Sequence, residues 1–318
     1  MEKQMQTTSS LAKPNGKNEV RGRNKVSAAA DAAIAAFVQA TVQAGVEGLR
    51  REFAEIKGYM PATPACTAFS EPANEARNRY KDVDYVHANF VKMEGVNRVF
   101  IAAQGPLEGT TADFWRMVYQ ESVSTILMLS RCEEAGKIKC FQYWPTEQGA
   151  YKNYGAMFVN NKKTEQRDRF ITFTLEVLPD GCSNSCIVHL IQMVDWPDRG
   201  VPTSGMSNKH AGPTVIHCSA GIGRTGTIMC VETAISRLWK GQSVEACPST
   251  RSLHSPAHSL QMKKVVCELR DRRASMVQTE GQFVFAHLVV LCYINAKMPK
   301  HRSAVMEFYE QFRQAQLN

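Results

Sequence analysis

A strand, a glycine-containing loop and a helix follow one another within residues 214–226 of this 318-residue chain. Val215 and Ile216 are β-branched and predict a short buried strand. Beyond the loop, apolar residues recur at helical spacing. Gly221 and Gly223 lie in the loop between strand and helix. Such a loop turns successive backbone N–H groups into one concavity at the positive end of a helix dipole, which predicts an anion site that suits a phosphate.

Two side chains of this loop indicate which reaction the anion site would support. A nucleotide-binding phosphate loop would carry a lysine, whereas this loop begins with Cys218 and ends with Arg224. A guanidinium can hold two oxygens of a phosphoryl group, and it favours the nucleophilic thiolate form of a nearby cysteine. We therefore expect phosphoryl transfer to Cys218. A lone cysteine is more often buried and inert, but the combination with His217 and Thr225 argues against that alternative.

His217, Cys218, five further residues, Arg224 and Thr225 form the pattern His-Cys-x5-Arg-Ser/Thr. At these residues the chain resembles the cysteine-dependent protein tyrosine phosphatases, and specifically the tyrosine-specific, non-receptor type. The resemblance covers roughly residues 48–296, with further motifs in family order. It implies an α/β fold, in which a twisted mixed β-sheet is flanked by helices and the phosphate-binding loop joins a strand to a helix.

Composition supports one large globular domain, since 44% of the residues are hydrophobic and 21% are charged. We expect a disordered basic tail over residues 1–27, the phosphatase domain over 28–296 and a C-terminal helical extension over 297–318. The Ala-rich stretch 28–57 predicts an amphipathic helix with breaks at Gly45 and Gly48. We expect this helix to pack on its own domain rather than on a membrane.

Several function classes are disfavoured by the sequence. The ten cysteines have no disulfide-framework spacing, and Cys182 and Cys186 lack the partners of a zinc site. We find no signal-peptide pattern and no run apolar enough to span a membrane, so we expect a cytoplasmic protein. The net charge of +8 is dispersed, which gives weak evidence for any partner and predicts no nucleic-acid binding. The oligomeric state is left open.

Residues 78–83 resemble the phosphotyrosine-recognition loop of the tyrosine-specific phosphatases. The resemblance implies that Tyr80 stacks on the substrate ring and that Asp82 accepts N–H groups of the bound peptide. This wall would make the pocket too deep for a phosphoserine to reach the thiolate. Read alone, the segment would be a polar loop before a strand. The other implied substrate-binding residues are Ser219, Ala220, Gly221, Ile222, Gly223, Arg224 and Gln282.

Residues 195–202 contain a Trp-Pro-Asp motif that is similar to the general-acid loop of the family. Two prolines and a glycine around Trp196 predict a hinged but otherwise stiff loop. The resemblance implies that Asp198 protonates the leaving tyrosine and then acts as a base on water. No metal or cofactor is implied, because Arg224 and the loop N–H groups neutralise the phosphoryl charge.

The resemblance gives supporting roles to six more residues. Gln278 would position the hydrolytic water, with Gln282 as its companion. Thr225 would hydrogen-bond the thiolate, and His217 would orient the loop. Glu134 would hold Arg224, and Lys139 would approach the general-acid loop. Read without the resemblance, the stretch around Glu134 is a solvated charged turn. Thr279 and Gln282 likewise fit a helix capping box.

Two segments depart from the family pattern. Residues 203–213 are too short and too rich in Gly and Ser for the helix that family members usually have there. Residues 246–259 form an apparent insertion, for which an irregular loop is a better interpretation than a metal site at Cys247, His254 and His258.

Taken together, the motifs predict a protein-tyrosine phosphatase. The alternatives are a phosphotyrosine-binding pseudo-phosphatase impaired by segment 203–213 and, last, a rhodanese-like or redox thiol protein.

The remaining pattern predicts the order of the other elements. Strands are expected at 98–107, 125–129, 169–178 and 186–194, a hairpin at 132–145, and helices at 113–121, 262–273, 283–294 and 305–312.

Overall fold

A mixed β-sheet forms the centre of the computed structural model of this chain. The structure describes residues 26–61, 71–79, 88–167, 169–194, 196, 213–242 and 261–315. Within these residues the strand order of the large sheet is β1-β2-β10-β3-β9-β8-β7-β6, and β4 and β5 form a separate hairpin.

The four central strands of the sheet are parallel, and the outer strands pair antiparallel. Ile216 of β10 is in register with Ala102 of β2 on one side and with Leu127 of β3 on the other. The strands are β1 (Ala88–Val91), β2 (Phe100–Ala103), β3 (Thr125–Met128), β4 (Glu133–Glu134), β5 (Lys137–Ile138), β6 (Tyr151–Tyr154), β7 (Met157–Gln166), β8 (Phe170–Pro179), β9 (Cys186–Met193) and β10 (Thr214–His217).

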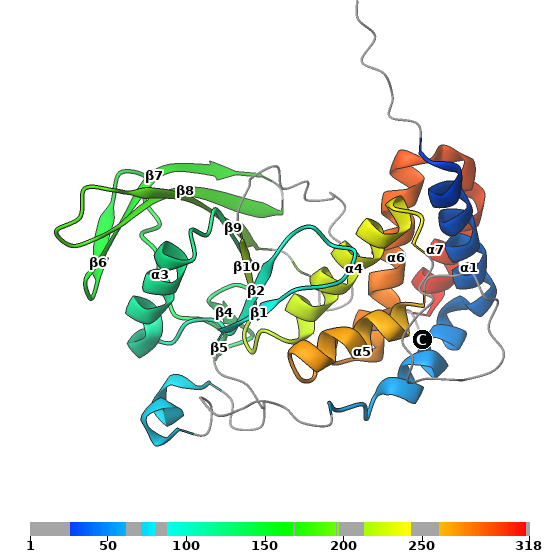
Figure 1. The fold of residues 1–318 in the computed structure, drawn as a ribbon, viewed down its shortest axis with the longest axis horizontal. Helices are drawn as coiled ribbons and strands as arrows, with labels where there is room; N and C mark the ends of the chain where they lie inside the picture. The colour runs from blue at the N-terminus through cyan, green and yellow to red at the C-terminus, as the bar shows by residue number, and fades with distance from the viewer. Residues whose placement is uncertain are drawn as a thin grey trace, which may run out of the picture.

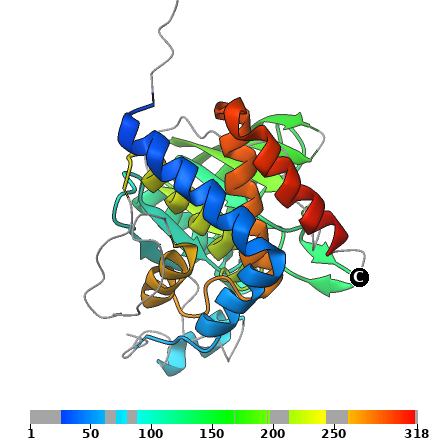
Figure 2. The ribbon, with the colours of Figure 1, turned by 90° about the vertical axis from the view of Figure 1, so that its right-hand side faces the viewer.

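Helices cover both faces of the sheet (Figure 1). One face carries α3 (Thr111–Gln120). The other carries α1 (Ala28–Ile56), α4 (Gly223–Trp239), α5 (Met262–Arg272), α6 (Glu280–Lys297) and α7 (Arg302–Gln314). In the turned view, α1 and α7 lie outermost with α6 behind them (Figure 2). Short 3-10 turns are η1 (Pro72–Arg77), η2 (Glu108–Thr110) and η3 (Pro299–His301).

Strict alternation along the central strands separates two hydrophobic cores. Side chains of a strand point to opposite faces at a period of two residues. The core with α1, α4, α5, α6 and α7 receives Phe100, Ala102, Leu127 and Ile216. The core with α3 receives Ile101, Ala103, Ile126, Met128 and Val215. Because these strands are buried on both faces, they read as continuous apolar runs in the sequence.

The expected α/β fold is confirmed, and the expected strands and helices form within a few residues of their expected bounds. No strand was expected within residues 146–168, where β6 and β7 form. These strands lie at the outer end of the sheet. The second half of β7 is polar and mostly exposed, so it lacks the apolar alternation that identifies a strand.

Helix α1 corrects one statement made from the sequence. Its most apolar 18-residue window has a mean hydropathy of 1.3, so by length and composition it could cross a membrane, contrary to our reading that no run could. In the structure it packs on the domain, with Phe37 and Phe53 in the large core. Its backbone breaks at Gly45, where φ is 61°, whereas the expected break at Gly48 is absent from the continuing helix.

Lowering the pH should destabilise the fold through two buried histidines. Burial lowers the pKa of His217 and of His287 from 6.5 to about 4. The unfolded chain therefore takes up these protons at a higher pH than the folded chain does. The free energy of unfolding should be intact above about pH 6.5 and should fall as the pH drops toward 4, by about 2 kcal/mol per histidine at pH 5.

A substitution on α6 isolates one of these contributions. His287 stacks on Phe37, and its Nδ1 lies 2.9 Å from the carbonyl oxygen of Phe283. His287→Asn keeps a side-chain N–H donor but cannot be protonated. Urea unfolding at pH 7 and pH 5 should show that the free energy of unfolding of this variant falls by about half as much as that of the wild type. The control His301→Asn replaces a half-buried histidine, and its free energy of unfolding should fall nearly as much as that of the wild type. A fall in His287→Asn equal to that of the wild type would contradict this prediction.

Candidate active site

The loop that follows β10 lies at the carboxyl end of the central parallel strands, and α4 begins directly after it at Gly223. Cys218 is the first residue of the loop and is only 6% exposed. Ligands of open α/β sheets bind outside the carboxyl ends of the strands. The predicted strand, loop and helix are therefore in place at a position that suits an anion.

The backbone carbonyl groups of the loop are held on its outer side. The oxygen of Ser219 accepts from Gly105 N at 2.9 Å, and that of Ile222 accepts from Val277 N at 3.1 Å. The carbonyls of Ala220 and Gly221 both accept from the guanidinium of Arg273, at 3.2 and 2.8 Å. In a trans peptide the N–H points opposite to the C=O. Fixing these oxygens outward turns the N–H groups inward.

The sulfur of Cys218 receives two donors from this arrangement. Gly221 N lies 3.3 Å from Sγ, and Thr225 Oγ1 lies 3.4 Å from it. Thr225 is fully buried in the first turn of α4. Donors at the N-terminus of a helix stabilise a thiolate. The structure thus brings Cys218 and Thr225 together as the sequence pattern predicted.

Two glycines of the loop permit close approaches. Gly221 has a φ of 74°, and a Cβ there would lie 2.1 Å from Ala103 O, so a side chain fits neither the backbone nor the space. A Cβ at Gly223 would lie 2.5 Å from Gln278 Oε1 and 2.8 Å from Gln282 Nε2. Both glutamines named from the sequence therefore reach the end of the loop.

Thr279 and the two glutamines also cap α6. The Thr279 side chain accepts from Gln282 N at 3.2 Å, and Gln282 Oε1 accepts from Gln278 N at 2.8 Å. This is the expected capping box with one difference. The Gln282 side chain accepts from the N–H of Gln278 and not from that of the N-cap residue Thr279. The cap fixes Gln282 and the backbone of Gln278 beside the loop.

Arg224 is gripped by Glu134 of the β4–β5 hairpin. Nη1 and Nη2 of Arg224 lie 2.6 and 2.7 Å from the two oxygens of Glu134, and Nη1 donates to Leu129 O at 2.9 Å. Burial opposes ionisation of Glu134, but the hydrogen bonds and charge of Arg224 outweigh it, so the pKa of the carboxyl is lowered. This bidentate pair fixes the plane of the guanidinium.

His217 is a neutral link beneath the loop. Burial lowers its pKa to about 4. Burial also raises the pKa of Tyr143 well above its usual value, so the phenol keeps its proton. Tyr143 Oη lies 2.7 Å from His217 Nε2, and His217 Nδ1 lies 3.2 Å from Cys218 O. The consistent assignment has Tyr143 donating to Nε2 and Nδ1–H donating to the carbonyl.

The remaining named residues divide into two groups. Lys139 is half-buried at the end of the hairpin, and its charge helps to lower the pKa of Glu134. The ring of Trp196 packs 5.4 Å from that of Phe285 on α6. The other residues and segments named from the sequence lie outside the described residues: Tyr80, Asp82, Asp198, the insertion 246–259 and the shortened segment 203–213 apart from Pro213.

Sequence reasoning missed three residues that shape the loop, namely Gly105, Tyr143 and Arg273. Arg273 is 1% exposed, although it ends a run of charged residues that is typical of a solvated helix end. Tyr143 lies in the stretch 132–145, which was predicted as a hairpin without a role for this tyrosine. A Cβ at Gly105 would lie 2.6 Å from Cys218 O. No local pattern identifies these contacts, since each joins segments far apart in the chain.

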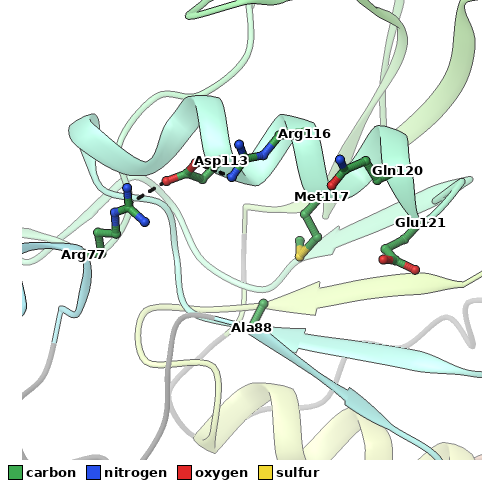
Figure 3. Close-up of a pocket in the computed structure, with 7 residues that line it drawn as sticks. All are labelled: Arg77, Ala88, Asp113, Arg116, Met117, Gln120 and Glu121. Carbon is green, nitrogen blue, oxygen red and sulfur yellow. Dashed lines mark hydrogen bonds and ion pairs between the residues drawn. The ribbon is translucent and has the colours of Figure 1, made fainter. Parts of the chain in front are cut away.

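A separate small pocket of about 260 Å³ lies between η1, β1 and α3. Figure 3 shows Asp113 between Arg77 and Arg116, with Glu121 at the other end. Asp113 lies 3.8 Å from Arg77 and 3.0 Å from Arg116. Asp113 pairs with both guanidinium groups and Glu121 adds a second carboxylate, so the two positive charges of the lining are balanced by two negative ones and the pocket does not favour an anion.

Comparisons with known proteins agree with this geometry. Residues 69–292 match the family model described as protein-tyrosine phosphatase, and the chain belongs to that family. It is 32% identical over 250 residues to tyrosine-protein phosphatase non-receptor type 4 of Homo sapiens, covering 69% of this chain and 25% of that protein.

Other relatives include both subdivisions of the family. Tyrosine-protein phosphatase 2 of Dictyostelium discoideum is 33% identical over 230 residues, which cover 69% of this chain and 57% of that protein. Receptor-type tyrosine-protein phosphatase eta of Gallus gallus is 29% identical over 303 residues, which cover 83% of this chain and 20% of that protein. The chain spans 20% to 57% of the length of these three relatives. Because receptor types also match, the expected non-receptor subdivision is not confirmed.

Anion binding should depend on the clamp that holds Arg224. Glu134→Gln removes the charge that pairs with both guanidinium nitrogens, so the Kd for inorganic phosphate should rise about 10-fold, or about 1.4 kcal/mol. Isothermal titration calorimetry measures this directly. Glu133→Gln is the matched control, since Glu133 precedes Glu134 in β4 and is exposed. Equal affinities in the two variants would contradict the role of the clamp.

Proposed function

We propose that this chain is a protein-tyrosine phosphatase, a phosphoric monoester hydrolase that acts on phosphotyrosine in proteins through a cysteinyl-phosphate intermediate. The observation that carries the proposal is the nucleophile in its setting. Cys218 Sγ lies at the base of a loop whose N–H groups are turned inward, with two donors on the sulfur and Arg224 fixed beside it by Glu134. The printed names of the relatives support the substrate class.

The first chemical step is transfer of the phosphoryl group to sulfur. Arg224 and the inward N–H groups bind the three equatorial oxygens, so charge is stabilised without reorganisation of the loop. Cys218 attacks phosphorus in line, an S–P bond forms and the P–O bond to tyrosine breaks. In this proposal Asp198 supplies the proton to the leaving phenolate.

The second step is hydrolysis of the cysteinyl phosphate. Gln278 positions water against phosphorus, and Asp198, now ionised, takes a proton from it. The S–P bond breaks, and inorganic phosphate leaves. Thr225 stabilises the departing thiolate, which the distance of 3.4 Å between Oγ1 and Sγ supports. His217 holds the Cys218 carbonyl, so it acts on the loop and not on the substrate.

Substrate selection is assigned to the wall of the pocket. Tyr80 would stack on the phosphotyrosine ring, and Asp82 would accept backbone N–H groups of the peptide. The N–H and guanidinium groups that surround Cys218 would take the phosphate whichever side chain carries it. Selection for tyrosine therefore has to come from pocket depth. Equal turnover of short phosphoserine and phosphotyrosine peptides would contradict it.

The proposed organisation is a phosphatase domain over 28–296, between a basic tail at 1–27 and a helical extension at 297–318. In the extension, Phe308 is fully buried in the large core, so α7 is docked on the domain. A cytoplasmic signalling role is the proposed setting. The free state of the cysteines in the described ranges supports a reducing compartment.

Two substitutions test the mechanism against the alternative of a phosphotyrosine-binding pseudo-phosphatase. Cys218→Ser should abolish phosphate release from a phosphotyrosine peptide while binding is retained, because the hydroxyl is a poor nucleophile at its free pKa. Asp198→Ala should lower kcat on the order of 100-fold or more, since general-acid catalysis contributes that much.

The matched controls are Cys182→Ser and Asp180→Ala, because both residues are exposed in the turn between β8 and β9. Both should keep wild-type kcat. Micromolar peptide binding without turnover at any pH in the wild-type protein would favour the pseudo-phosphatase instead. Full turnover in Cys218→Ser would overturn the covalent mechanism.

A further inference from the structure

Cys132 and Cys140 lie opposite each other at the base of the β4–β5 hairpin. The N–H groups of Lys139 and Cys140 both donate to Cys132 O, at 2.8 and 3.2 Å. Two residues opposing one is the arrangement of a β-bulge. Residues bonded in this way have Cα atoms about 5 Å apart, which is inside the range that a disulfide bridges.

The two thiol side chains have different surroundings. Cys140 Sγ lies 3.2 Å from Phe141 O. The neighbouring Cys140 lowers the pKa of the Cys132 thiol, and burial opposes that shift. Burial raises the pKa of Cys140 well above its usual value. Cys140 is only 1% exposed, whereas Cys132 is half-buried and lies 3.5 Å from Gln142 Oε1. Cys132 is therefore the thiol that a small solute can reach.

We propose that Cys132 and Cys140 form a peroxide-oxidisable dithiol that closes to an intramolecular disulfide. The Cys132 thiolate attacks one oxygen of hydrogen peroxide and the O–O bond breaks. Cys132 becomes a sulfenic acid, and the other oxygen departs as water. Cys140 then attacks that sulfur, the S–O bond breaks, and a second water leaves. Both thiols lose one proton and one electron each, and the peroxide is reduced to two waters.

The dithiol lies directly behind the Cys218 loop. A Cβ built on Gly105 would lie 3.1 Å from Cys140 Cβ and 2.6 Å from Cys218 O, so Gly105 alone separates the two at this point. The hairpin that the disulfide would close carries Glu134, the partner of Arg224. The proposal does not rest on turnover, because Cys132 and Cys140 react with each other and not with the phosphoryl group.

Peptide mapping of the full chain tests the disulfide. Cys218→Ser protein removes the catalytic thiol, and hydrogen peroxide followed by alkylation and trypsin then reports on the remaining ones. Cleavage after Arg131, Lys137, Lys139 and Lys152 places the two cysteines in separate peptides, 132–137 and 140–152. We expect these peptides to appear joined, with the summed mass less two hydrogens, and to separate on reduction.

Variants define the outcomes. Cys132→Ser should abolish the joined peptide and leave Cys140 alkylated as fully as in protein that was not treated with peroxide, since peroxide does not reach the buried Cys140 first. Cys182→Ser removes an exposed thiol outside the pair and should leave the joined peptide unchanged. The proposal is overturned if Cys132 accumulates as a sulfenic or sulfinic acid without the joined peptide, or if neither peptide is oxidised while Cys182 is.

Discussion

The site depends on which way the peptide units of one short loop face. Ser219, Ala220, Gly221 and Ile222 have their carbonyl oxygens bonded on the outer side, so the N–H groups face the anion. A buried carbonyl oxygen left without a hydrogen-bond donor would destabilise the fold by about 1–3 kcal/mol. Arg273 satisfies two of these oxygens and adds a positive charge behind the loop. The preference for an anion is thus built into the backbone before any substrate-contacting side chain is considered.

The sheet explains why this loop can be so tightly constrained. β10 is paired in parallel on both sides, and its side chains enter both cores. The end of the strand is therefore fixed in all directions, and α4 leaves it at Gly223. Gly105 and Gly221 are the points where the loop touches the end of β2. At these two glycines the close packing of the sheet leaves no room for a Cβ.

How much of the site could be predicted depends on sequence distance. Cys218, Arg224 and Thr225 lie within one strand-loop-helix unit, so spacing alone predicted their proximity. Glu134 and Gln278 were named only through a family resemblance, because nothing local indicates a partner far along the chain. Arg273 was missed because its charge suggests solvent, and burial is a property of the assembled core. β6 and the second half of β7 were missed for the opposite reason, since their mostly exposed, polar residues show no apolar alternation.

The arrangement has a front layer that binds and a back layer that holds. In front, Arg224 is already paired with Glu134, so part of its charge is compensated before an anion arrives. The inward N–H dipoles must then contribute a large share of the binding, which makes the back layer of Arg273, His217 and Tyr143 energetically important without any contact to the ligand. His217 suits that layer because it stays neutral there and donates to Cys218 O. A charged histidine in that place would cost its own desolvation. Behind the loop, the charged Arg273 and the neutral His217–Tyr143 pair hold the backbone, and in front Arg224 is a cation partly compensated by Glu134, which together allow a buried site to receive a dianion.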